Sequence, residues 1–120
     1  MEILIGNAFP MTLIRRHSIH VEEIDLEELR GLAASRGVKS FWGHENTRRA
    51  AEAELGVSLK PPVERPVITL DVDSLPALDG VSFRECYVLS PEYRQSFRPA
   101  IGAEVALADI VRWHALRLQW

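Results

Sequence analysis

The sequence predicts an α/β fold: a single small domain, residues 1–120, with a mixed β-sheet of about five strands flanked by helices. The length fits one domain, which can bury roughly two-thirds of its unfolded surface without disulfides or metals. The composition, 47% hydrophobic and 26% charged, is typical of globular proteins. Short aliphatic runs alternate with stretches of helical spacing, so we expect helices packed on a sheet.

Elements predicted in the first third of the chain begin with a strand. Residues 2–6, "EILIG", form a short aliphatic run that ends at Gly6 and Asn7, as a buried strand would. Pro10 predicts a loop there, followed by a short helical turn. Residues 18–25 alternate imperfectly and predict a second strand.

Two helices are expected next. Residues 26–36 carry leucine and alanine at helical spacing, with Asp25 placed as a cap and Gly37 as a stop. The second helix begins near residue 44 and ends at Gly56. The stretch 59–66 contains three prolines, which predicts an irregular connector.

The second half is expected to be richer in strands. Residues 65–73 give the clearest alternation, and residues 81–89 predict another strand after a turn. Residues 90–102 are expected to be irregular or a hairpin. The spacing of apolar residues in 107–115 predicts a short helix, and 116–120 a closing strand.

Composition excludes several classes of function. The single cysteine, Cys86, cannot form an internal disulfide and favours a reducing compartment. There is no apolar run of about eighteen residues, and the first residues do not resemble a signal peptide, so we expect a cytoplasmic protein without a membrane partner. With a net charge of -3, DNA is not an expected partner, and an anionic ligand requires a local basic cluster.

No cofactor or metal is expected. The four histidines lack the spacing of metal ligands, and no Cys-x-x-Cys pair is present. The glycine-rich loops that hold dinucleotides or triphosphates are also absent. The chain contains serine, histidine and aspartate, so residue types alone do not exclude a Ser-His-Asp catalytic triad. The Gly-x-Ser-x-Gly motif that often carries such a serine does not occur.

The start of the second helix has an unusual sequence, "WGHENTRR", at residues 42–49. A helix N-terminus offers unpaired N–H groups and positive potential, which suit a phosphate. Gly43 lets the backbone approach a ligand, and histidine is a suitable general acid near neutral pH. Thr47 and Arg48 lie three and four positions beyond His44, on the same side of the helix. These residue types are compatible with a helix start that receives an anion and, taken alone, are more typical of a plain helix cap.

The order of short motifs resembles one known family. A strand leads into Asn-Ala-Phe, a Gly-His pair followed by threonine opens a helix that ends in Leu-Gly, and an arginine begins the next strand. This arrangement, over residues 2–72, resembles small viral and prokaryotic ring nucleases. These enzymes degrade cyclic tetra-adenylate, the second messenger of type III CRISPR immunity, and the viral members act as anti-CRISPR proteins.

The resemblance implies a homodimer that cleaves cyclic tetra-adenylate without metal, the ribose 2′-hydroxyl attacking its own phosphate. It implies two catalytic residues, His44 as general acid and Arg65. The ligand-binding residues that it implies are Asn7, Ala8, Phe9, Gly43, Thr47, Arg48 and Arg98. The sequence departs from the family at Pro10, where a serine is frequent, and at Ile101, where an acidic residue is expected after Arg98.

Simpler interpretations stay open for each residue. His44 is also typical of a plain helix cap, Asn7 of a turn at a strand end, and Arg48 of a solvated helix face with Glu52 as its partner. Trp42 and Cys86 are expected in the core. Two other functions are compatible with the sequence: a non-catalytic sponge for the cyclic nucleotide, and a small interaction protein that blocks a CRISPR effector or a host factor.

Overall fold

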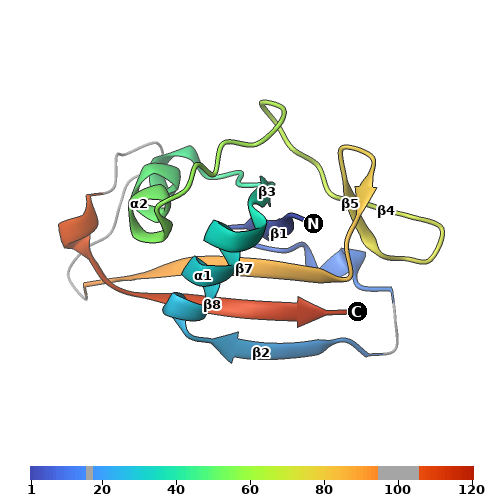
Figure 1. Cartoon of the computed structure of the whole chain (residues 1–120), viewed down its shortest axis with the longest axis horizontal. Coiled ribbons are helices and arrows are strands. Elements are labelled where there is room, and N and C mark those ends of the chain that lie inside the picture. Colours follow the sequence, from blue (N-terminus) through green and yellow to red (C-terminus); the bar gives the residue numbers. More distant parts are fainter. Residues whose placement is uncertain (16–17, 95–105) are drawn as a thin grey trace.

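A mixed five-stranded sheet forms the centre of the computed structural model, which describes residues 1–15, 18–94 and 106–120 (Figure 1). Its strand order is β2-β8-β7-β1-β3. The strands are β1 (Ile3–Gly6), β2 (His20–Ile24), β3 (Val38–Ser40), β7 (Glu85–Tyr93) and β8 (Ile110–Gln119). Strand β1 runs parallel to both β3 and β7, whereas β8 is antiparallel to both β7 and β2. The predicted fold class, an α/β domain with a mixed sheet, is confirmed.

Two helices have the predicted positions and ends. They are α1 (Leu26–Arg36) and α2 (Glu45–Leu55). Gly37 ends α1 with φ 77°, and Gly56 ends α2 with φ 74° in the left-handed region, which side chains disfavour. A 3-10 turn, Met11–Leu13, follows Pro10 as expected. The structure shows no helix long and apolar enough to cross a membrane within these described segments.

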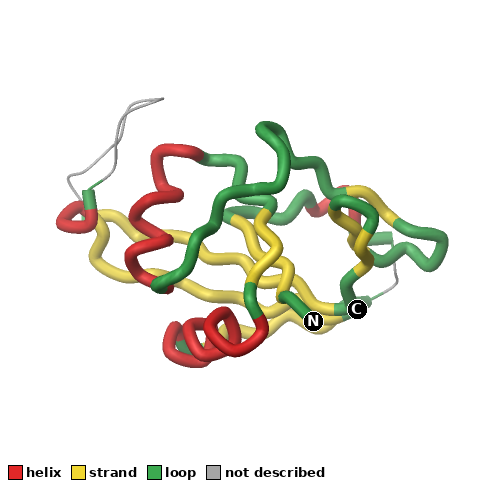
Figure 2. The backbone as a smooth tube through the Cα atoms, turned by 45° about the horizontal axis from the view of Figure 1, so that its top comes forward, coloured by secondary structure: helices red, strands yellow, loops and turns green. Residues whose placement is uncertain are grey.

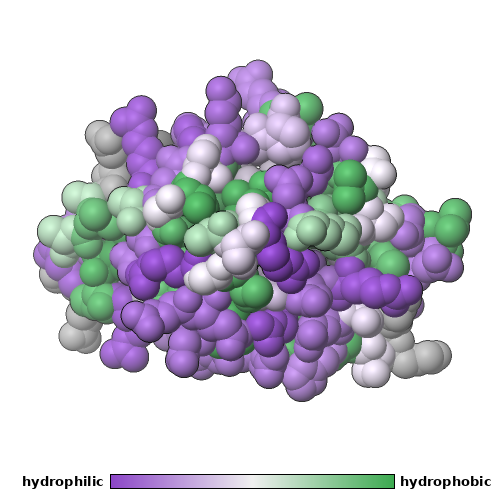
Figure 3. Space-filling model, viewed as in Figure 1, coloured by the Kyte–Doolittle hydropathy of each residue, from purple (hydrophilic) through white to green (hydrophobic). Residues whose placement is uncertain are grey.

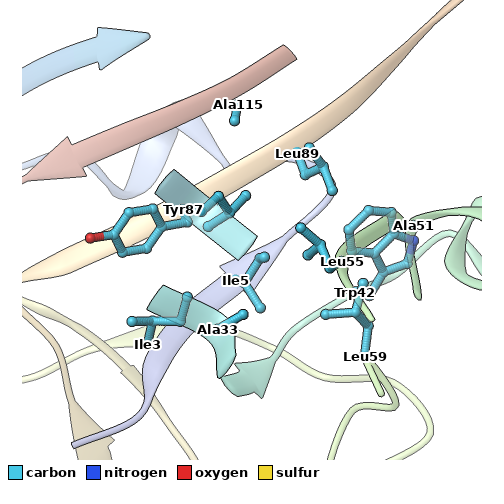
Figure 4. Packing of buried hydrophobic residues seen from close by; sticks show 11 residues of the cluster. Ile3, Ile5, Ala33, Trp42, Ala51, Leu55, Leu59, Tyr87, Leu89 and Ala115 are labelled. Carbon is cyan, nitrogen blue, oxygen red and sulfur yellow. The ribbon is translucent and has the colours of Figure 1, made fainter. Parts of the chain in front are cut away.

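Both helices pack on one face of the sheet. Leu29 and Ala33 of α1, and Ala51 and Leu55 of α2, are buried against this face. They contact side chains of β1, β7 and β8, shown in Figure 4 as Ile3, Ile5, Tyr87, Leu89 and Ala115. Trp42 lies in the same cluster at 3% exposure, so its predicted core position is confirmed.

Loops and a small second sheet cover part of the other face. This sheet contains β4 (Thr69–Leu70), β5 (Pro76–Leu78) and β6 (Val81–Ser82), and the connector from α2 leads to it (Figure 2). Cys86 is buried there, as predicted, and burial raises the pKa of its thiol. Because β1 has a cluster on each side, all four of its residues are buried.

Several predicted elements in the second half are wrong. The expected strand 65–73 is reduced to β4, and the expected turn 74–80 contains β5. The strand expected over 81–89 is divided between β6 and β7, and β7 continues to Tyr93. The helix expected over 107–115 is a 3-10 turn, Leu107–Asp109, followed by β8. Pairing with β7 along nearly the whole of β8 outweighs the helical spacing of a few apolar residues.

The surface does not show one dominant apolar patch in the view of Figure 3, where apolar side chains are scattered among hydrophilic ones. This is ordinary for a protein surface. Hydrophilic side chains protrude along the upper edge, where Figure 1 places α2 and the connector.

Gly6 gives a stability test that does not depend on function. A Cβ at Gly6 would lie 2.3 Å from Phe41 Cε2, and the Phe41 ring is buried against Phe9. We expect Gly6→Ala to lower the free energy of unfolding by about 1–3 kcal/mol through overpacking, measured by urea denaturation. Gly31→Ala on α1 is the control, because its Cβ would meet nothing within 4 Å and should not destabilise the protein. An unchanged urea midpoint for Gly6→Ala would contradict this packing.

Candidate functional site

Two of the predicted motifs meet at the carboxyl ends of β1 and β3. Asn7 directly follows β1, and its Oδ1 accepts a hydrogen bond of 3.0 Å from the backbone N–H of Gly43. Because β1 and β3 are parallel neighbours, the loops that leave them emerge at the same edge of the sheet. This edge, beyond the carboxyl ends of parallel strands, is where α/β proteins commonly bind ligands.

Hydrogen bonds from a buried tryptophan fix the start of α2. The Trp42 indole Nε1 lies 2.9 Å from the His44 carbonyl oxygen and 3.1 Å from Thr47 Oγ1, and donates to both. The Thr47 backbone N–H and hydroxyl also donate to the His44 carbonyl, each at 3.1 Å. The unusual sequence at this helix start therefore has a structural reason: Trp42 and Thr47 hold the backbone of His44.

The same hydroxyl orients the His44 ring. His44 Nδ1 lies 3.2 Å from Thr47 Oγ1. The hydroxyl also accepts from the Trp42 indole, and its one hydrogen lies within reach of both the His44 carbonyl and Nδ1. Because Thr47 engages Nδ1, Nε2 is the ring nitrogen that can reach a ligand. His44 itself is exposed.

Thr47 positions His44 through this contact. Thr47 is only 3% exposed, so it does not itself reach a ligand. We expect Thr47→Val to lower the rate of any His44-dependent reaction by about tenfold, a part of the roughly 10²–10⁴-fold that a positioned acid contributes, because the acid stays present and only its orientation is lost. Thr47→Ser, which keeps the hydroxyl, should retain most of the rate. The measurement is the single-turnover rate with binding affinity determined in parallel. Equal rates for the two variants would remove the hydroxyl from this role.

A cleft of about 610 Å³ lies between the start of α2 and the proline-rich connector. Its lining includes Gly43, three basic residues and two acidic ones, so basic side chains are in excess: Arg48, Lys60, Arg65, Glu45 and Glu64. A Cβ at Gly43 would meet nothing within 4 Å, so the backbone there faces open space. The cleft thus combines a helix N-terminus with positive side chains, which favours an anion.

Arg48 does not have a free charge. Glu45 Oε1 lies 2.5 Å from one terminal nitrogen of its guanidinium, and Glu52 Oε2 lies 3.1 Å from the other. Hydrogen bonding to Glu45 is the main cause of the raised pKa of Arg48, and hydrogen bonding to Arg48 lowers the pKa of Glu45. The predicted pairing with Glu52 is present, and Glu45 is a second partner that the sequence analysis missed.

A second hollow, of about 390 Å³, adjoins the cleft. Gly43 lines both, and the chain passes from one to the other at Arg65 and Pro66. Its walls are largely apolar and include Asn7 and Ala8. A ligand with charged and flat apolar parts could occupy both hollows at once.

The remaining predicted site residues fall in different places. Phe9 is 9% exposed and packs on Phe41 and Trp120, so its ring belongs to the core. Arg65 lies in an irregular bend ahead of β4, so its expected place at the start of a strand is wrong. Arg98 lies outside the described residues. Lys60, a basic residue within the proline-rich connector, also lines the cleft, and the sequence analysis missed it.

Within residues 1–15, 18–94 and 106–120, no group of three or more histidine, cysteine, aspartate or glutamate side chains is arranged to hold a metal ion.

Comparisons with known proteins show similarity at the level of the fold. No protein-family model matches this sequence, and no curated protein matches it either. Among solved structures, protein B116 of Sulfolobus turreted icosahedral virus is similar, with a TM-score of 0.60. The two chains are 15% identical, and the likeness covers 100% of each. A viral protein therefore shares this fold.

Proposed function

We propose that this protein is a metal-independent ring nuclease that binds and cleaves cyclic tetra-adenylate. The observation that carries the proposal is the hydrogen bond between Asn7 and Gly43, which joins two separate motifs beside His44. The cleft with Arg65 and Lys60 supports it, since the ligand carries a negative charge on each phosphodiester. Cleavage of this messenger would switch off type III CRISPR ancillary effectors, in an anti-CRISPR or a self-limiting host role, in the cytoplasm.

The chemistry uses the substrate's own hydroxyl. The ribose 2′-oxygen attacks the adjacent phosphorus, the bond from phosphorus to O5′ breaks, and a 2′,3′-cyclic phosphate forms. Protonated His44 donates its Nε2 proton to O5′ as that oxygen leaves, and the 2′-hydroxyl proton passes to solvent. Arg65 and the N–H groups at the start of α2 stabilise the charge on phosphate oxygens. Binding across both hollows would hold the attacking and leaving oxygens in line.

The proposal includes a homodimer. A ring of four identical nucleotides has two-fold symmetry, which matches a pair of chains related by a two-fold axis. Each chain would contribute one His44 and one Arg65 to opposite sides of the ring.

Two alternatives each have an observation in their favour. His44 is not among the lining residues of either hollow, which favours a sponge that binds the ring without cleaving it. Val63, Val67 and Val72 are exposed on the connector and small sheet, which favours an interaction protein. Turnover distinguishes the enzyme from the sponge, and ligand binding distinguishes both from the interaction protein.

The binding part of the proposal is tested by titrating the full-length His44→Ala variant, which leaves the ring intact, with labelled cyclic tetra-adenylate in EDTA. We expect saturable binding of one ring per two chains, with the mass of the complex measured by native mass spectrometry. Binding of one ring per single chain would contradict the dimer. No binding of the ring would reject both the nuclease and the sponge.

A further inference from the structure

The two carboxylates that hold Arg48 differ in their own surroundings. Glu52 is 24% exposed in its side chain, and its Oε2 also accepts a hydrogen bond of 2.8 Å from the Leu59 backbone N–H. Glu52 therefore ties the beginning of the connector to α2 and has a structural role. The Glu45 side chain is 77% exposed, and its ion-pair partner is Arg48.

The Glu45 carboxylate binds the Arg48 guanidinium with both oxygens, as a phosphate ligand would. Its Oε1 lies 2.5 Å from Nη2 of Arg48, and its Oε2 lies 3.1 Å from Nε. These two nitrogens form the edge of a guanidinium that binds carboxylate and phosphate in the same two-pronged way. Glu45 is also the first residue of α2, where a negative charge interacts favourably with the helix dipole.

We propose that the Glu45 carboxylate occupies the phosphate position on Arg48, and that a phosphate of the ligand binds by displacing it. This inference rests on the proposed function, because it concerns the same cleft. Both residues line that cleft, together with Lys60 and Arg65. The exposure of this pair lies on the Glu45 side, at 77% against 17% for Arg48, so the carboxylate can move into water while an incoming phosphate takes over its contacts to Arg48.

Displacement makes Glu45 a specificity-determining residue. A small monoanion would gain only the contact to Arg48, and it would have to compete for that contact with the Glu45 carboxylate, which belongs to the same chain. A ligand with several phosphates keeps its contacts to Lys60 and Arg65 while it replaces Glu45. The cleft would therefore select multiply charged phosphate ligands over single small anions.

The test compares Glu45→Gln with Glu54→Gln, a matched change on the same helix. Glu54 pairs with Arg30 at 2.8 Å and does not line the cleft. Each full-length variant is titrated with inorganic pyrophosphate and, in the His44→Ala background so that the ring stays intact, with cyclic tetra-adenylate in EDTA. We expect Glu45→Gln to bind each probe about three- to fivefold more tightly, the upper range for loss of an exposed competing pair. Glu54→Gln should bind like the wild type.

A double-mutant cycle shows whether Glu45 acts through Arg48. The gain from Glu45→Gln should vanish in an Arg48→Ala background. A gain of equal size in that background would overturn the proposal, because it would reflect only the removal of a negative charge. Unchanged or weaker binding by Glu45→Gln, or no binding of either probe by any variant, would also overturn it.

The outcomes separate this inference from the proposed function. If Glu45→Gln strengthens pyrophosphate binding through Arg48 while cyclic tetra-adenylate does not bind, the displacement stands and the ring nuclease is rejected. If the ring binds and is cleaved but Glu45→Gln changes neither affinity, the nuclease stands and the displacement is rejected. Thermal unfolding of each variant, followed by circular dichroism, checks that the fold is intact.

Discussion

Replacing His44 with alanine is expected to lower the single-turnover rate of cyclic tetra-adenylate cleavage by about a hundredfold or more, the usual contribution of a general acid. The reason is that the leaving O5′ then departs without a proton donor. Affinity should change little, because His44 does not line the cleft that would hold the phosphates. The rate is measured with enzyme in excess, and affinity by equilibrium titration.

His114→Ala is the matched control for this experiment. His114 lies on β8, with Nδ1 3.5 Å from Glu23 Oε1 and Nε2 3.5 Å from Glu92 Oε2. It belongs to β8 and not to the start of α2, where His44 lies, so its removal should leave the rate near that of the wild type. Near wild-type cleavage by His44→Ala would remove His44 from the mechanism.

Replacing Arg65 with alanine is expected to weaken binding of cyclic tetra-adenylate by about ten- to a hundredfold. A charge-assisted contact to phosphate contributes roughly 1.5–3 kcal/mol. The exposed position of Arg65 favours the lower end of this range, because water screens the interaction. Affinity is measured in the His44→Ala background, so that the ligand stays intact during the titration.

Arg49→Ala in the same background is the control for charge. Arg49 is an exposed neighbour of Arg48, about 100° further round the helix, and does not line the cleft. Its loss should change affinity far less than the loss of Arg65. If Arg49→Ala weakens binding and Arg65→Ala does not, the site is placed wrongly even if the protein binds the ring.

Local signals in the sequence predicted most of the first half of the fold. Glycine stops at Gly37 and Gly56 and the aliphatic run of β1 are short-range features, and each predicted its element correctly. Strand β3 was missed because its three residues are too short for a visible alternation. The first part of strand β8 was mistaken for a helix because its few apolar residues have helical spacing, and a local pattern does not reveal its pairing with the end of β7.

The sequence predicted the motifs of the site but not how they are arranged in space. The parallel pairing of β1 with β3 brings Asn7 to Gly43, and no single-sequence signal reveals that pairing. The hydrogen bonds of Trp42 were also missed, because a tryptophan before a helix is usually a core residue. Glu45 was overlooked because an acidic residue in a first turn is ordinary on helix-dipole grounds.

The most direct test of the central claim is incubation of the full-length protein with labelled cyclic tri-, tetra- and hexa-adenylate in EDTA, with the products identified by mass spectrometry. The account predicts that cyclic tetra-adenylate is converted to linear products ending in a 2′,3′-cyclic phosphate, at a rate that EDTA does not change. An intact ring after prolonged incubation would contradict the claim of cleavage. Cleavage that is lost in EDTA and restored by a divalent ion would contradict the claim of a metal-independent mechanism.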